Sequence, residues 1–183
     1  MRRFRIFRRI RRETKGAAAI EFAIIAPVFF LFIWGIFETG LVFFAKQTLT
    51  HGLQATSRQI RTGQAHSVQL SQSSFRTMVC DQIDYLLSCE ADSLYIDVQA
   101  YTNFPANGMD PPEDADGKFD GVNANHFDIG ESGSISGGSS IVLVRAYYVW
   151  PLFTPYISHF YADEEDGNTV LLSASVAFKN EPF

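Results

Sequence analysis

An acidic cluster in the middle of the chain has the residue types of a calcium site. Asp114, Asp116 and Asp120 fall within a stretch of seven residues. An EF-hand calcium loop requires glycine at its sixth position and glutamate at its twelfth. Counted from Asp114, these positions hold Phe119 and Asn125. The sequence therefore favours a solvated acidic loop over a metal site, and we expect neither a metal nor a cofactor.

The histidines are the side chains best suited to acid–base chemistry near neutral pH, and four are scattered along the chain: His51, His66, His126 and His159. His159 and Asp163 could form a dyad, but a spacing of four is more typical of a surface pair on a short helix. Zinc-protease, nucleophile-elbow, phosphate-binding and dinucleotide-binding motifs do not occur. We therefore expect a protein that is not an enzyme.

Two cysteines, Cys80 and Cys89, are the only thiols. A small even number is typical of a single disulfide in an exported domain, and two buried thiols are the alternative. In a straight helix their Cα atoms would lie about 13 Å apart, whereas a disulfide requires about 4.4–6.8 Å. If they bond, a helix must therefore end near Ser88 and the chain must turn back.

Glu21 is the only charged residue in an apolar stretch that runs from Ala17 to Phe37. Its 21 residues match the roughly 20 that a helix needs to cross a bilayer. Residues 1–16 carry eight basic groups and one acid, a net charge of +7, whereas residues 17–183 carry −12. Basic residues before a span stay in the cytoplasm, so we expect a single-pass membrane protein with a cytoplasmic N-terminus and an external C-terminal domain. Because that domain is acidic, nucleic acid is not expected as a partner.

The junction between Gly16 and Ala17 offers a site for processing. The apolar stretch is too long for a cleaved secretory signal, and no small-residue cleavage site follows it. Cleavage after Gly16 would remove the basic leader and retain the apolar helix, with Glu21 as the fifth residue. The new α-amino group could then pair with Glu21 and set the axial register of packed helices. The alternative is a shallow interfacial glutamate that costs little.

This arrangement resembles the type IV prepilin signature and, more specifically, the TadE-like family of Tad (Flp) pilus pseudopilins. Further segments fit the pattern: Pro27, Glu38–Gly40, Arg61–Gln64, Arg145–Pro151 and Asn180–Phe183. The resemblance implies a minor pilin that is cut between Gly16 and Ala17 by a prepilin peptidase, with Glu21 and Phe22 acting in assembly. Its partners would be inner-membrane lipid, other pilins or pseudopilins and the Tad assembly machinery.

The elements that position these residues follow from periodicity. A helix is expected over 17–63, bent at Pro27. Its second part is amphipathic, because a stripe repeats at helical spacing, formed by Ala45, Leu49, Leu53, Thr56 and Ile60. A second helix follows, capped by Ser71, Ser73 or Ser74.

Three strands are expected, near 94–101, 141–150 and 169–178, with a mobile acidic loop over 103–138. The fold class is thus α+β: a long helix and a second helix packed on a three-stranded antiparallel sheet, with 64–183 forming the periplasmic domain. A different function would suit the same layout, namely an unprocessed, single-span, membrane-anchored periplasmic binding module.

Overall fold

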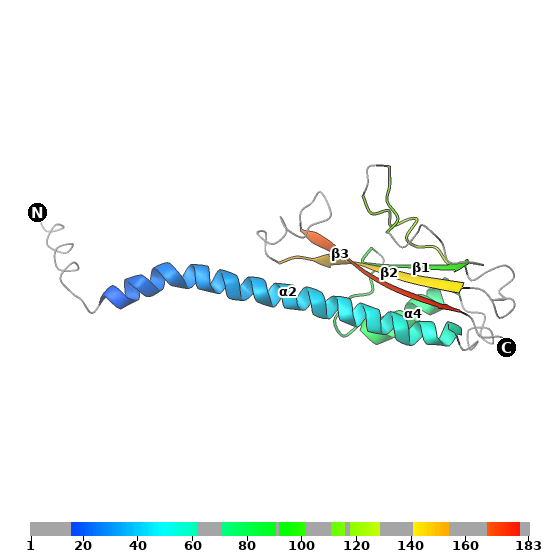
Figure 1. Cartoon of the computed structure of the whole chain (residues 1–183), viewed down its shortest axis with the longest axis horizontal. Helices are drawn as coiled ribbons and strands as arrows, with labels where there is room; N and C mark the ends of the chain where they lie inside the picture. The colour runs from blue at the N-terminus through cyan, green and yellow to red at the C-terminus, as the bar shows by residue number, and fades with distance from the viewer. Residues whose placement is uncertain are drawn as a thin grey trace, which may run out of the picture. The chain divides into compact units, whose positions relative to one another are not determined.

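The computed structural model describes residues 16–61, 71–90, 92–101, 111–115, 118–128, 141–153 and 168–179. The chain divides into two compact units, Met1–Gly40 and Leu41–Phe183. The expected basic leader (up to residue 15), His66, Asp116, His159 and Asp163 lie outside the described residues. The described elements follow in the order helix, helix and three strands, which confirms the α+β class (Figure 1).

Helix α2 (Ala17–Arg61) is 45 residues long and passes through Pro27 without interruption. At 1.5 Å per residue it extends about 68 Å. Its first part belongs to the first unit and its second part, from Leu41, to the second. The bend expected at Pro27 stays a prediction, whereas the single long helix is confirmed.

In the second unit, the amphipathic stripe predicted for α2 is confirmed, because all five of its members have at most 1% of their surface exposed: Ala45, Leu49, Leu53, Thr56 and Ile60. Helix α4 (Gln72–Ile83) packs beside this stripe and runs in the opposite direction. The Thr56 hydroxyl donates to the Met78 carbonyl at 3.4 Å, and Gly52 lies against the Ile83 side chain. Ser71 caps α4 by accepting a hydrogen bond from the Ser74 amide.

The sheet contains strands β1 (Leu94–Tyr101), β2 (Ile141–Pro151) and β3 (Thr169–Lys179), in the order β1-β2-β3 and antiparallel throughout. One face of the sheet contributes alternate apolar residues to the core shared with both helices, for example Ile96, Ala146 and Ala174. Burial of one face against the helices explains the alternation that predicted β1. Strand β2, predicted as an uninterrupted β-rich run, is buried on both faces over most of its length.

A short segment within the predicted loop lies along the outer edge of β1. The Val98 amide donates to the His126 carbonyl at 2.9 Å, and the Asp128 amide donates to the Val98 carbonyl at 2.8 Å. Phe127 packs against the core, and Ala124 is fully buried. The expectation of an exposed insertion therefore misses this docked segment, which gives part of the β1 edge the hydrogen-bond partners that it would otherwise lack.

Candidate functional site

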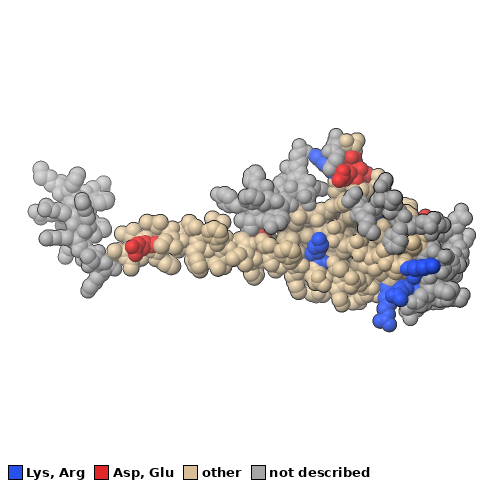
Figure 2. Space-filling model, viewed as in Figure 1, with Lys and Arg blue, Asp and Glu red and all other residues tan. Residues whose placement is uncertain are grey.

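The first candidate site is the apolar surface of α2 in the first unit. Gly16 immediately precedes the helix, and Ala17 is its first residue. Glu21 is exposed, and so is Phe22, at 67%. Figure 2 shows acidic atoms near the start of the described part of α2 and uncharged surface along the turns that follow.

Every large apolar side chain of this segment lies open. From Ile20 to Phe37 the exposed fractions range between 49% for Ile33 and 71% for Ile36. A water-soluble protein rarely exposes so continuous an apolar surface. The helix is also long and apolar enough to cross a membrane. The segment can therefore bury this surface in lipid or against other apolar helices.

The cysteine pair lies in the second unit and forms a disulfide. Cys80 is in the last turn of α4, and Cys89 follows the turn after the helix, with 6.0 Å between their Cα atoms. The predicted reversal of the chain is confirmed, but α4 ends at Ile83, earlier than the predicted end near Ser88, and a turn leads from there to Cys89. Arg76 holds the reversed segment in place by donating to the carbonyls of Glu90 and Leu94.

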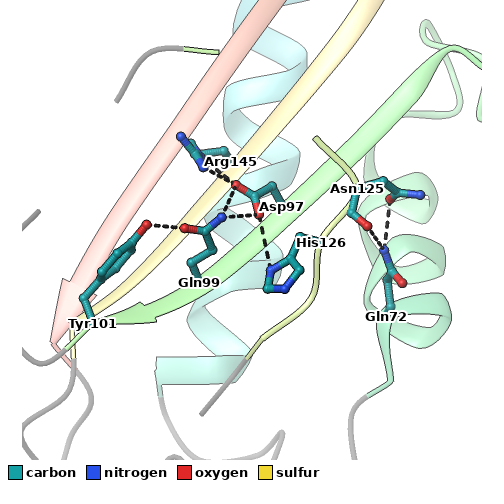
Figure 3. A network of polar contacts seen from close by, with 7 residues as sticks. All are labelled: Gln72, Asp97, Gln99, Tyr101, Asn125, His126 and Arg145. Carbon is teal, nitrogen blue, oxygen red and sulfur yellow. Dashed lines mark hydrogen bonds and ion pairs between the residues drawn. The ribbon is translucent and has the colours of Figure 1, made fainter. Parts of the chain in front are cut away.

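The second candidate site is a polar network on the face of the sheet opposite the helices (Figure 3). Asp97 is fully buried and accepts hydrogen bonds from the Nε and a terminal nitrogen of Arg145, at 2.8 Å for Nε. Gln99 donates to the Asp97 carboxylate at 3.1 Å, and the Tyr101 hydroxyl donates to the Gln99 carbonyl oxygen. The His126 Nδ1 lies 3.9 Å from Asp97 Oδ1.

A cavity of about 310 Å³ opens beside this network, and Gln99, His126 and Arg145 line part of its wall. The Arg145 guanidinium compensates the charge of the Asp97 carboxylate, and the Gln99 amide adds a hydrogen bond. This geometry is that of a structural ion pair. Sequence reasoning did not assign a role to Asp97 or His126. Arg145 could have indicated this pair from the sequence, because it is a charged residue inside an otherwise apolar strand. A charged side chain that is buried in a strand needs a partner of opposite charge.

Two described aspartates of the predicted acidic loop, Asp114 and Asp120, serve as local caps. Asp114 Oδ1 accepts a hydrogen bond from the Lys118 amide at 2.9 Å. Asp120 Oδ1 accepts from the amides of Asn123 and Val122, and the Asn123 amide contributes most to holding the pKa of Asp120 below its ordinary value. Among the described residues no three potential ligands are close enough to hold a metal ion.

Together, the fold and the exposed helix define an α+β protein whose N-terminal helix can act as a membrane anchor. Comparison with known families agrees: residues 16–58 match the family model described as TadE-like protein. The match begins at the predicted processing junction and ends within α2, so it confirms the resemblance over this part of the chain. Searches of curated proteins and of solved structures find no match.

Proposed function

We propose that this chain is a minor pilin or pseudopilin that takes part in assembly of a Tad (Flp) pilus. The N-terminal helix anchors it in the bacterial inner membrane, with residues 1–16 in the cytoplasm and the second unit in the periplasm. A prepilin peptidase removes the basic leader after Gly16, and the retained helix packs against the helices of other pilins. The role is structural, without catalysis.

The observation that carries this proposal is the exposed apolar surface of α2, which starts one residue after Gly16. Cleavage at that bond would leave a mature chain that is helical from its first residue. An exposed Glu21 would then lie one turn from the new amino terminus, about 6 Å along the axis. Pairing these opposite charges, within one chain or between neighbours, would fix how far the helices slide past one another.

The periplasmic placement of the second unit has two supports. The +7 leader favours the cytoplasmic side of the membrane. The disulfide between Cys80 and Cys89 is of a kind that persists in oxidising compartments such as the periplasm.

Mass spectrometry of the mature N-terminus tests the processing step. We expect the native protein to begin at Ala17. Gly16→Leu should begin at Met1, because a bulky residue before the cut blocks the peptidase, while the open space around Gly16 leaves the fold unchanged. Gly40→Leu is the matched control, since Gly40 is equally open, and it should be cut normally. A native protein that retains Met1 would refute processing.

Substitution of Glu21 tests the assembly role. Glu21→Gln keeps the shape and removes the charge, and Glu21→Ala removes both. We expect both variants to insert in the membrane and both to reduce piliation, counted by electron microscopy. Normal piliation in either variant would show that the carboxylate does not set the register.

An unprocessed binding module is the second candidate, and the cavity beside His126 is the observation that favours it. For this function, a small ligand should raise the thermal stability of the whole protein. Calcium is the first probe, because the acidic loop suggested it. A melting temperature that does not move with added calcium would remove the cation version of this candidate.

A further inference from the structure

Four aromatic side chains among the described residues of the second unit are exposed, and they belong to segments that neighbour one another: the first turns of α2 in this unit, the turn after α4 and the residues that follow β2. Phe43 is 68% exposed, Phe44 53%, Tyr85 68% and Phe153 64%. We call this set the aromatic end of the domain. Exposed aromatic residues are common singly, but a group on one end of a domain marks an interaction surface.

Hydrogen bonds show that separate elements meet there. The Tyr85 hydroxyl donates to Thr48 Oγ1 at 3.2 Å, one helical turn after Phe44. Ser88 lies in the same reversed segment, and its hydroxyl is 3.2 Å from the hydroxyl of Tyr148 in β2. Tyr148 is close to the C-terminal end of β2, and Phe153 follows that end. The turn after α4 therefore lies beside the first turns of α2 in this unit and beside the C-terminal part of β2, the strand that leads to Phe153 (Figure 1).

The surface of α2 leading to this end carries no exposed charge. Between Glu21 and Lys46 the only ionisable residue is Glu38, which is only 2% exposed. The 24 residues from 22 to 45 extend about 36 Å. The hydrocarbon core of a bilayer is about 30 Å thick, so the uncharged surface is longer than the core. A helix that crosses the bilayer with this stretch would place its last uncharged turn, with Phe43 and Phe44, at the headgroup region.

The charges near the aromatic end decide which lipid surface it suits. Exposed acids follow α4 at Asp84, Glu90 and Asp92, so anionic headgroups would be repelled. Aromatic rings favour the interface between headgroups and acyl chains through their apolar bodies and, for tyrosine, a polar tip. The aromatic end therefore suits a zwitterionic lipid surface, and its binding to such a surface should not depend on the salt concentration.

We propose that the aromatic end of the domain lies in the outer headgroup region of the membrane, with Tyr85 and Phe153 inserted beside α2. The inference rests on the proposed function, because it requires that α2 span the membrane. It adds a second contact with lipid, made by the domain itself, which would hold the domain against the bilayer before assembly.

Spin labels on the full-length protein test this contact. Tyr85→Cys and Phe153→Cys place labels at the aromatic end. Val122→Cys is the matched control, since Val122 is 86% exposed and lies in the loop beside the β1 edge. The native cysteines are joined in a disulfide and do not react. Each labelled chain is reconstituted at one copy per phosphatidylcholine nanodisc, and its accessibility to oxygen and to a water-soluble nickel chelate is compared by power-saturation EPR.

We expect the oxygen-to-nickel accessibility ratio at residues 85 and 153 to be several-fold higher than at residue 122, at both low and high salt. A ratio equal to that at residue 122 overturns the inference while leaving the anchor intact. Protection that appears only with several chains per disc overturns it in favour of protein–protein contact. Failure of the native chain to enter the discs would refute the anchor itself and this inference with it.

Discussion

At the scale of single residues, the buried pair of Asp97 and Arg145 is the clearest determinant of stability. Asp97 is fully buried and Arg145 is 8% exposed, and they face each other across the β1–β2 register. Such a pair contributes little compared with an apolar pair of the same volume, but loss of one partner leaves a charge without compensation.

We expect Asp97→Ala to lower the free energy of unfolding by about 3–5 kcal/mol, measured by chemical denaturation in detergent. Arg145→Met should cost a similar amount. The double variant Asp97→Val, Arg145→Met should recover most of the loss, because both charges are removed together. A double variant as unstable as the sum of the two single variants would contradict this account.

Asp120 gives the expected pH dependence at the same scale. Its pKa is lowered, first by the Asn123 amide, from an ordinary value of 3.8. A depressed pKa means that the carboxylate stabilises the turn above the ordinary value and loses this effect as the pH falls through the folded-state value.

The amide resonances of Val122 and Asn123 should therefore titrate with a midpoint below 3.8, measured by NMR. Asp120→Asn keeps an acceptor oxygen but does not ionise, so its amides should not follow this curve. A midpoint at or above the ordinary value would be the contrary result.

At the scale of elements, the sequence predicted what local periodicity determines. The stripe from Ala45 to Ile60 followed from helical spacing. Cap chemistry offered Ser71, Ser73 or Ser74 for α4, and the structure has Ser71. Alternation predicted β1, and β-rich or apolar composition predicted β2 and β3. The sequence did not predict that Asp97 faces Arg145, because register depends on pairing between strands 48 residues apart. Nor did it predict that residues 126–128 dock on β1, since a polar loop carries no periodic signal.

Gly52 tests the packing of α2 against α4. A Cβ there would collide with the buried side chain of Ile83 and lie 3.4 Å from the Gln82 Cβ. We expect Gly52→Ala to destabilise the protein by about 1–3 kcal/mol through overpacking, although alanine alone favours helix by about 1 kcal/mol. Gly40→Ala meets nothing within 4 Å, so its thermal stability should be unchanged or slightly raised. Equal effects of the two variants would argue against close α2–α4 contact.

At the scale of the whole molecule, the two units differ in the surface that they present. Met1–Gly40 exposes apolar side chains along α2, whereas Leu41–Phe183 has its own core. This contrast was predictable, because the basic leader, the apolar stretch and the acidic remainder follow one another in the sequence.

The disulfide reports the orientation of the whole chain. We expect Cys80 and Cys89 of the native protein to be oxidised to a disulfide in the periplasm of growing cells. When the cells are then denatured without reductant and treated with maleimide-polyethylene glycol, neither cysteine should react. Replacement of Arg8, Arg9, Arg11 and Arg12 by serine weakens the orientation signal, so a fraction of that variant should react at both thiols. The readout is a shift in gel mobility, and full reaction of the native chain would place the domain in the cytoplasm.

The way in which α2 packs has a mechanical consequence. Within the second unit, α2 supplies Leu49, Leu53 and Ile60 to the core. A pull along the axis of α2 in this unit would thus be resisted as shear across many interlocked side chains, a geometry that bears load far better than one whose contacts peel apart singly.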